Sequence, residues 1–298
     1  KLKKGRSYNF RIEMYENGGG AYAALGWNGM TSKINPMEEA ISLSKKSDIV
    51  IFVGGIIEGE GRDRSELHLS GKQEELLSSI INTGVPTVVV LMAGSAVTME
   101  KWIDNVPAIV DAWYAGEEGG NAVADVLFGD YNPGGKLPIT FPQSVGQCPL
   151  YYNVKPSGRG YDYIERSGSP LFPFGHGLSY TSFEYTNIKI EKPEISRWEK
   201  ATIKIDIQNI GTRKGDEVVQ LYIHDVVASV TRPLIELKGF QRVPLEPKEK
   251  TTVTFILNPD DLSFLDANMK YTVEPGRFDI LIGSSSSDIR QRGVLTVK

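Results

Sequence analysis

The chain has 298 residues and a formal net charge of −4, and it contains no polybasic run. This charge pattern argues against nucleic acid as a partner, and apolar runs such as residues 85–93 are too short to cross a bilayer. The single cysteine, Cys148, excludes an intramolecular disulfide. The length allows two domains with separate cores, and because the first residue is Lys1 rather than Met, we expect one part of a longer protein.

The first predicted element is a short β segment at the N-terminus. Residues 7–15 alternate apolar and polar side chains, residues 16–20 are rich in glycine, and residues 21–27 can return as a second strand. A β-hairpin alone is marginally stable in water. We therefore expect its partner strands to lie upstream of this chain.

Residues 35–142 alternate the patterns of helices and strands. The predicted helices are 36–46, 71–83, 97–102 and 121–128, and the predicted strands are 48–54, 87–92 and 108–113. Ser70 and Asn121 are the expected N-caps, and Gly129 is expected to end the last helix. The expected core stripes are Met37, Ala40, Ile41 and Leu43 on the first helix and Leu76, Leu77, Ile80 and Ile81 on the second. This alternation predicts an α/β sandwich domain, a mostly parallel sheet with flanking helices.

The rest of the chain has a different character. Residues 143–183 are rich in proline, glycine and tyrosine, and we expect an ordered connection without regular elements. Residues 184–298 contain repeated runs in which apolar and polar side chains alternate, separated by turn signals. This pattern predicts a small β-sandwich. The alternating apolar positions are Ile203, Ile205, Ile207, Val219, Leu221, Ile223, Val253, Phe255, Leu257, Phe278, Ile280 and Ile282.

The chemistry of the chain is most visible in the glycine-rich segment 55–64, directly after a predicted strand. Ligands bind beyond the carboxyl ends of strands in open α/β sheets. Two interpretations stay open for its acidic residues, a solvated acidic loop or a carboxyl group that transfers protons. Glu60 is the strongest candidate because Gly59 and Gly61 flank it, whereas Asp63 and Arg64 are expected to hold the loop.

Other chemistries find little support in the residues. Glu117 and Glu118 precede a predicted helix, whose N-terminus favours the ionised carboxylate and so disfavours proton donation. The histidines His68, His176 and His224 are not spaced as metal ligands, so we expect no metal and no cofactor. Tyrosines between residues 151 and 163 can stack on a sugar ring, but packing the connection is the commoner role.

Three long motifs resemble glycoside hydrolase family 3. The first is Glu-Gly-Glu-Gly-Arg-Asp-Arg at residues 58–64, followed by Leu-His-Leu at 67–69 and by Gln73. The second is the segment 113–138, beginning Trp-Tyr-Ala-Gly-Glu-Glu-Gly-Gly, and the third is Pro-Phe-Gly-His-Gly-Leu-Ser-Tyr within 173–183. The resemblance covers about residues 29–298 and implies four regions. These are the closing strands of a protective-antigen-like β domain (1–28), an α/β sandwich domain carrying the acid/base loop (29–160), an ordered linker (161–183) and a fibronectin type III-like domain (184–298).

The resemblance implies a retaining β-glycosidase, most often a β-glucosidase, that acts on a β-linked glucoside or oligosaccharide. Such enzymes use two carboxyl groups about 5–5.5 Å apart. In the family the nucleophile is an Asp on a preceding barrel domain, for which this sequence has no counterpart, and the general acid/base matches Glu60. Glu58 and Arg62 are weaker candidates for substrate binding. We therefore expect the barrel, as a domain or separate chain, to be the partner, and the chain alone to be inactive.

Two non-catalytic alternatives stay open, a carbohydrate-binding module and a structural scaffold for a partner domain. The carbohydrate-binding module would need only the sandwich and the aromatic residues and would tolerate the loss of Glu60. β-Glucosides are the default substrates implied by the resemblance, and β-xylosides come next. A bacterial secreted or periplasmic location and a cytoplasmic one are both compatible with the sequence.

Overall fold

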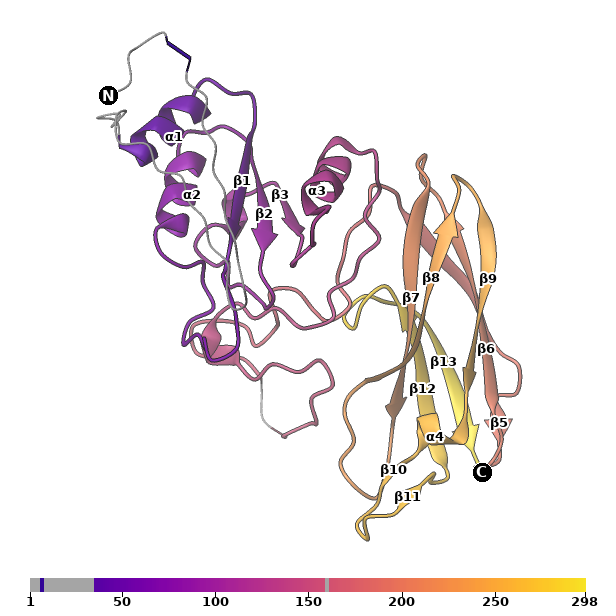
Figure 1. The fold of residues 1–298 in the computed structure, drawn as a ribbon. Coiled ribbons are helices and arrows are strands. Elements are labelled where there is room, and N and C mark those ends of the chain that lie inside the picture. The colour runs from indigo at the N-terminus through magenta and orange to yellow at the C-terminus, as the bar shows by residue number, and fades with distance from the viewer. Residues whose placement is uncertain (1–5, 8–34, 159–160) are drawn as a thin grey trace, which may run out of the picture.

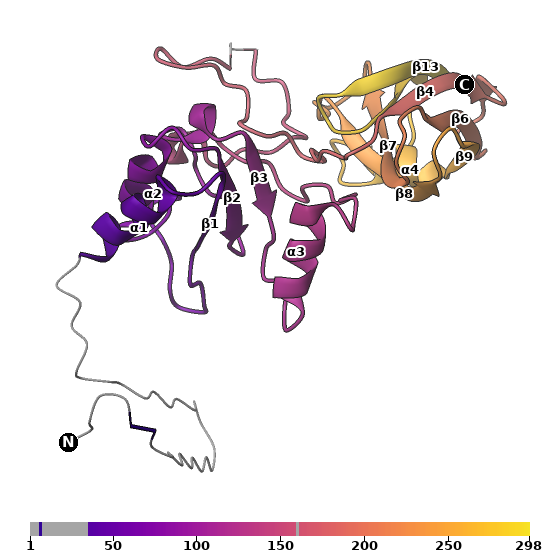
Figure 2. The same cartoon turned by 90° about the horizontal axis from the view of Figure 1, so that it is seen from above.

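The computed structural model describes residues 6–7, 35–158 and 161–298, and the predicted N-terminal hairpin therefore lies outside the described residues, apart from Ser7. An α/β region is followed by a region of β-strands, with a connection of irregular backbone between them (Figure 1). Figure 2 gives the same arrangement from above, with α1 and α2 beside β1, and α3 beside β3.

The α/β region is built on three strands that pair in the order β1-β2-β3, and both pairs are parallel. Its elements are α1 (Pro36–Ser44), β1 (Val50–Gly55), α2 (Gln73–Ile81), β2 (Thr87–Met92), η1 (Ile103–Asn105), β3 (Ala108–Asp111), α3 (Gly119–Phe128) and η2 (Val145–Gln147). The loops after the three strands therefore start from one edge of the sheet, as expected for parallel strands joined by helical crossovers.

One face of this sheet forms the core of the α/β region. Phe52 on β1 and Leu91 on β2 pack in one cluster with Leu77 and Ile80 of α2. Side chains alternate between the two faces of a strand, so Ile51 and Val53 point to the opposite face. That face is less well covered within the described residues, where Ile51 is 44% exposed and Val53 is 63% exposed.

The predicted helix stripes are partly confirmed. Leu77 and Ile80 are buried, and Leu76 and Ile81 pack against the same cluster. The predicted buried face of α1 was wrong at one position, because Leu43 is exposed and Ser44 is buried instead. Ser44 follows the helical spacing from residues 37, 40 and 41, and its hydroxyl donates to the carbonyl of Ala40 at 2.8 Å.

Three local predictions were wrong. Residues 97–102 are not helical, because Val97, Met99 and Trp102 are all buried and the amide of residue 98 donates to the carbonyl of Leu67 instead. Lys72, not Ser70, precedes α2. Asn121 lies inside α3, where its amide donates to the carboxylate of the cap residue Glu118 at 2.6 Å. The predicted end of this helix is confirmed, since Gly129 is left-handed with φ 81°.

The β-rich region contains two main sheets, of order β5-β13-β12-β7-β8 and β4-β6-β9. Its elements are β4 (Phe183–Ile190), β5 (Glu194–Ile195), β6 (Ala201–Asn209), β7 (Gly215–Asp225), β8 (Glu236–Leu245), β9 (Lys250–Leu257), α4 (Pro259–Leu262), β10 (Phe264–Leu265), β11 (Tyr271–Thr272), β12 (Gly276–Gly283) and β13 (Ile289–Val297). All twelve predicted core positions are buried in one cluster between these sheets. The predicted β-sandwich core is therefore confirmed, and it follows from the two-residue period of the strands.

Polar and aromatic contacts hold the α/β region, the connection and the β-rich region together. Lys136 forms a largely buried ion pair with Glu217 of β7 at 3.1 Å, and its ammonium also donates to the carbonyl of Gly177. The ring of Tyr152 stacks on Phe174 with centroids 4.2 Å apart, and its hydroxyl accepts from the amide of Leu237. These contacts show that two of the family-like motifs hold the regions together, and that Tyr152 packs the connection.

Candidate active site at the carboxyl edge of the parallel sheet

The acidic loop starts from a rigid base at the end of β1. The side-chain amide of Gln73 pairs with the backbone of Gly55 in both directions, accepting from its amide and donating to its carbonyl, each at 2.8 Å. The amide of Ile56 then donates to the carbonyl of Met92 on β2 at 2.9 Å. A side chain at residue 55 would lie 2.2 Å from that same carbonyl oxygen, so the close approach requires glycine.

Glu58 connects the loops that follow all three strands. Its carboxylate accepts hydrogen bonds from the amide of Gly94, at 2.8 Å, and from the hydroxyl of Ser95, both in the loop after β2. The hydroxyl of Tyr114, in the segment after β3, lies 3.3 Å from the same carboxylate and donates to the carbonyl of Ile56 at 2.6 Å. The carboxylate of Glu58 therefore holds the three loops together at this edge of the sheet.

The charge of Glu58 is balanced by Arg64 on the same loop. The guanidinium of Arg64 lies 3.0 Å from the carboxylate and donates to the hydroxyl of Ser95 at 2.5 Å. The Ser95 hydroxyl, the Gly94 amide and the Arg64 charge together hold the pKa of Glu58 below its ordinary value. A carboxyl group kept ionised in this way is poorly suited to donate a proton near neutral pH.

Glu60 lies two residues further on and has a different environment. The amide of Arg62 donates to the carbonyl of Gly59 at 3.0 Å, so residues 59–62 form a tight turn with Glu60 at its second position. Gly61 occupies the third position with φ 71°, a left-handed conformation that glycine adopts without strain. The Glu60 side chain is exposed, and no hydrogen bond or ion pair within the described part of the chain uses its carboxylate.

The other charged residues of the loop divide in the same way. Arg64 holds the loop, as expected, but its partners are Glu58 and Ser95 rather than Asp63. Arg62, Asp63 and Glu66 are exposed. The loop therefore presents the carboxyl group of Glu60 at its tip, with the guanidinium of Arg62 in the same exposed turn.

A second acidic residue at this edge of the sheet is Asp111, which ends β3. Burial raises its pKa to about 6, against a weaker opposing effect of the amide of Trp113, which donates to it at 3.4 Å. Its other carboxylate oxygen, Oδ2, is buried and has no hydrogen-bond partner among the described residues. The sequence prediction did not single out Asp111, because a single Asp at the end of a strand shows nothing about its burial.

Sequence reasoning also missed Gly94, Ser95, Tyr114 and Gln73, which support the loop. Gly94 and Ser95 directly follow a predicted strand, and Tyr114 follows the next one. The rule that parallel strands end at a common edge could have found these three. Gln73 belongs to the stretch that resembles the family's acid/base loop, but its role was not assigned, because a glutamine in the first turn of a helix is usually exposed.

The described residues contain neither a metal-binding cluster nor a membrane-spanning helix. Among the residues that the structure describes, no three His, Cys, Asp or Glu side chains are grouped closely enough to hold a metal ion. Within the same residues, no helix is both long and apolar enough to span a membrane.

Comparison with known proteins gives a consistent assignment over most of the chain. The periplasmic β-glucosidase of Salmonella typhimurium is 41% identical over 268 residues, which cover 86% of this chain and 35% of that protein. A β-xylosidase of Formosa agariphila is 46% identical over 268 residues, covering 87% of this chain and 37% of that protein. The chain thus spans little more than a third of the length of these relatives.

A solved structure and two family models agree with these relatives. The crystal structure of a β-glucosidase from Listeria innocua in complex with glucose superposes with a TM-score of 0.82 at 32% identity, over 87% of this chain and 38% of that one. The model of the glycosyl hydrolase family 3 C-terminal domain matches residues 13–180, and the model of a fibronectin type III-like domain matches residues 217–286. This chain therefore belongs to glycoside hydrolase family 3, as a C-terminal domain of that family followed by a fibronectin type III-like domain.

Proposed function

We propose that Glu60 is the general acid/base of a retaining β-glycosidase whose nucleophile lies on an upstream part of the protein or on a separate chain. The observation that carries the proposal is the contrast between two neighbouring carboxyl groups. Glu58 is engaged by Gly94, Ser95 and Arg64, whereas Glu60 is exposed at the tip of a turn on the same rigid base. Of the two, only Glu60 is available to a substrate that approaches the loop.

In this mechanism the two carboxyl groups share the reaction. The upstream carboxylate attacks the anomeric carbon while protonated Glu60 gives its proton to the leaving oxygen, which departs as an alcohol. Ionised Glu60 then removes a proton from water, which attacks the same carbon and releases the sugar and the nucleophile.

Two observations support an upstream part that covers this region. The chain matches only about 35–37% of the length of the two relatives named above. On the poorly covered face of the sheet, Ile51 and Val53 are exposed, and Ile57 in the acidic loop is 86% exposed. Parallel sheets normally have both faces covered, and exposed apolar groups of this kind mark contact surfaces. We propose that this upstream part carries the nucleophile and that the substrate is a β-glucoside or a β-xyloside.

Glu58 then acts through other residues rather than on the sugar. It ties the loops after β1, β2 and β3 together, and so it positions the turn that carries Glu60. Arg62, exposed in the same turn, is proposed to contact the substrate. The four regions expected from the sequence, 1–28, 29–160, 161–183 and 184–298, are proposed as the domain division around this site.

The proposal is tested by replacing Glu60 in the protein that includes its upstream part. Glu60→Ala should reduce kcat/KM by about 10²–10⁴-fold on a β-glucoside with a poor leaving group, because that step depends on proton donation. The loss should be much smaller for a nitrophenyl glucoside, whose leaving group needs no proton. Added azide should then accelerate turnover of the activated substrate and yield a β-glycosyl azide, because azide needs no general base.

Matched variants on the same loop provide the controls. Glu66→Ala, also at an exposed carboxylate, should retain wild-type kinetics on both substrates. Glu58→Gln should lower kcat without producing azide rescue, because a positioning residue does not transfer the proton. Wild-type kinetics of Glu60→Ala would instead favour the alternative, a non-catalytic carbohydrate-binding or scaffold role for this chain.

A further inference from the structure

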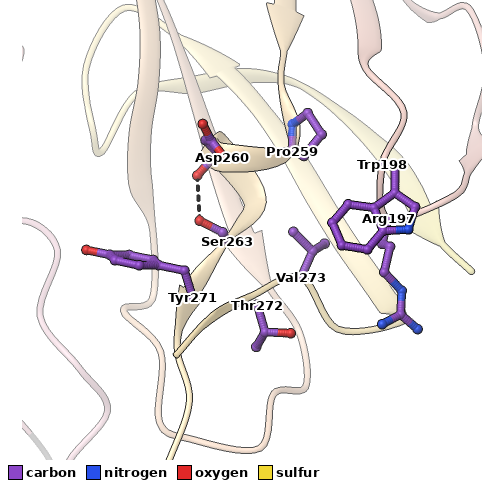
Figure 3. A pocket seen from close by; sticks show the side chains of 8 residues that line it. All are labelled: Arg197, Trp198, Pro259, Asp260, Ser263, Tyr271, Thr272 and Val273. Carbon is purple, nitrogen blue, oxygen red and sulfur yellow. Dashed lines mark hydrogen bonds between the residues drawn. The ribbon is translucent and has the colours of Figure 1, made fainter. Parts of the chain in front are cut away.

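The fibronectin type III-like region carries a hollow of about 480 Å³ that lies wholly outside the acidic loop. It is formed by the segment between β5 and β6, by α4 and the residue after it, and by β11 with its next residue. Two aromatic side chains, Trp198 and Tyr271, lie on opposite sides of the hollow, with Thr272 and Val273 between them (Figure 3). Its size falls within the range of about 300–1,000 Å³ that is usual for small-molecule sites.

The two aromatic residues are unusually exposed. Trp198 is 78% exposed and Tyr271 is 77% exposed, although the sandwich core beneath them is closed. Large aromatic side chains gain most of their free energy by burial, so two that face one hollow from opposite sides mark a contact surface. Each offers a flat ring face, which carries the negative part of the ring quadrupole.

Three of the polar side chains around the hollow have no partner among the described residues. Among the described residues, no hydrogen bond or ion pair involves the side chains of Arg197, Asp260 or Thr272. The hydroxyl of Ser263 donates to the backbone carbonyl of Asp260 at 2.9 Å (Figure 3). This hydrogen bond does not use the side-chain carboxylate of Asp260. The rim therefore holds one guanidinium donor, one carboxylate acceptor and one hydroxyl that can do both.

The segments that present these side chains are held in place by carboxylates. The carboxylate of Glu199 accepts from the amide of Ser196 at 2.7 Å and from the ammonium of Lys192 at 2.6 Å, which fixes the turn bearing Trp198. Across the hollow, Asp266 accepts from the amides of Asn268 and Lys270, which fixes the turn before Tyr271. The backbone that carries both aromatic residues is thereby fixed, which reduces the conformational entropy lost when a ligand binds.

We propose that this hollow is a carbohydrate-binding site for the pyranose rings of a neutral β-linked oligosaccharide. The C–H faces of a pyranose ring match the ring faces of Trp198 and Tyr271, and its hydroxyl groups can accept from Arg197 and donate to Asp260. A phosphate or acidic ligand would be repelled by Asp260, and a cationic ligand by Arg197. Nucleic acid would require a basic patch, which one Arg beside one Asp does not provide.

The test measures binding of cellohexaose and xylohexaose to the 298-residue chain by calorimetry and fluorescence. Trp198 is the only tryptophan in residues 184–298, so sugar binding should change the emission of the wild type. Trp198→Ala and Tyr271→Ala should each weaken binding by at least about tenfold. Trp198→Phe should retain most of the calorimetric affinity and lose the fluorescence change, since a ring face remains.

Two controls separate this site from folding defects and from the catalytic proposal. Phe240→Ala removes an exposed aromatic side chain of β8 that does not line the hollow, and it should bind as the wild type. Glu60→Ala should also leave hexaose affinity unchanged, so either proposal can fail without the other. The inference would be overturned if the wild type bound no hexaose, or if folded Trp198→Ala and Tyr271→Ala bound it as tightly as the wild type. Binding of a peptide in place of the sugar would also overturn it.

Discussion

The β-sandwich and the α/β region bury their apolar strands to very different extents. In the sandwich, Ile203, Ile205 and Ile207 on β6 are all 0% exposed, because the second sheet covers the inner face of the first. In the α/β region, Ile51 and Val53 of β1 are 44% and 63% exposed. The sandwich has a closed core of its own, whereas the three-stranded sheet leaves apolar side chains of β1 exposed among the described residues.

Two buried polar side chains at strand ends differ in their hydrogen bonding. The side chain of Asn209, at the end of β6, is 0% exposed and has partners for both ends of its amide, including the carbonyl of Leu245 and the hydroxyl of Thr181. Asp111, at the end of β3, has a buried carboxylate oxygen without a partner among the described residues. Single buried atoms without a hydrogen-bond partner among the described residues also occur in the β-rich region, at Tyr185 and Arg232, so this contrast holds for the two strand ends and not for the two regions as wholes.

The largest expected effect comes from the same substitution in the two regions. Ile205→Ala should lower the free energy of unfolding by about 2–5 kcal/mol, because it leaves a cavity in a closed core. Ile51→Ala should cost less than about 1 kcal/mol in this chain, because the side chain is already near solvent. Urea unfolding followed by circular dichroism measures both. Equal losses would contradict the comparison, and a larger Ile51→Ala loss once the upstream part is present would sharpen it.

A smaller effect is expected within the acidic loop itself. Glu58→Ala should cost about 1–2 kcal/mol at neutral pH, because the amide of Gly94 and the guanidinium of Arg64 lose their partner. The pKa of Glu58 is lowered in the folded state, so its contribution is present above its ordinary pKa and is lost as the pH falls below it. The carboxylate of Glu60 has no partner among the described residues, so Glu60→Ala should change the stability by less than about 0.5 kcal/mol.

The matched pair is measured by urea unfolding at neutral and acidic pH. The difference between Glu58→Ala and the wild type should narrow as the pH falls, while Glu60→Ala should follow the wild type throughout. If Glu60→Ala were the more destabilising of the two, the assignment of Glu58 as the structural carboxylate would be wrong.

The sequence predicted most where one periodicity decides the structure. The strands of the sandwich bury every second residue, so Ile205 and Leu221 could be assigned to the core from alternation alone. The left-handed end of α3 at Gly129 followed from residue type in the same way. Residues 97–102 could not be predicted, because burial of Met99 and Trp102 against other elements decides their conformation and leaves no periodic signal.

The candidate site was predictable as a place but not as a set of contacts. The glycine-rich segment after a strand placed an acidic loop at the edge of the sheet. The different environments of Glu58 and Glu60 depend on Ser95 and Arg64, which are distant from one another in the sequence. The flanking glycines singled out Glu60 within the loop, but no pattern within the loop could show that Glu58 would be engaged by Gly94, Ser95 and Arg64.

The smallest expected effect concerns Asp111, and it tests whether this side chain is buried without a full set of hydrogen-bond partners. Its pKa of about 6 lies above the ordinary value of 3.8, so the folded state binds the proton more tightly than the unfolded state does. Stability should therefore fall as the pH rises from about 4 to about 6 and stay level above that. Asp111→Asn should remove this pH dependence of the free energy of unfolding. The variant should be about 1 kcal/mol more stable than the wild type near neutral pH, and no more stable than the wild type at about pH 4. Urea midpoints at the two pH values measure the effect, and an unchanged slope in the variant would assign the proton to another group.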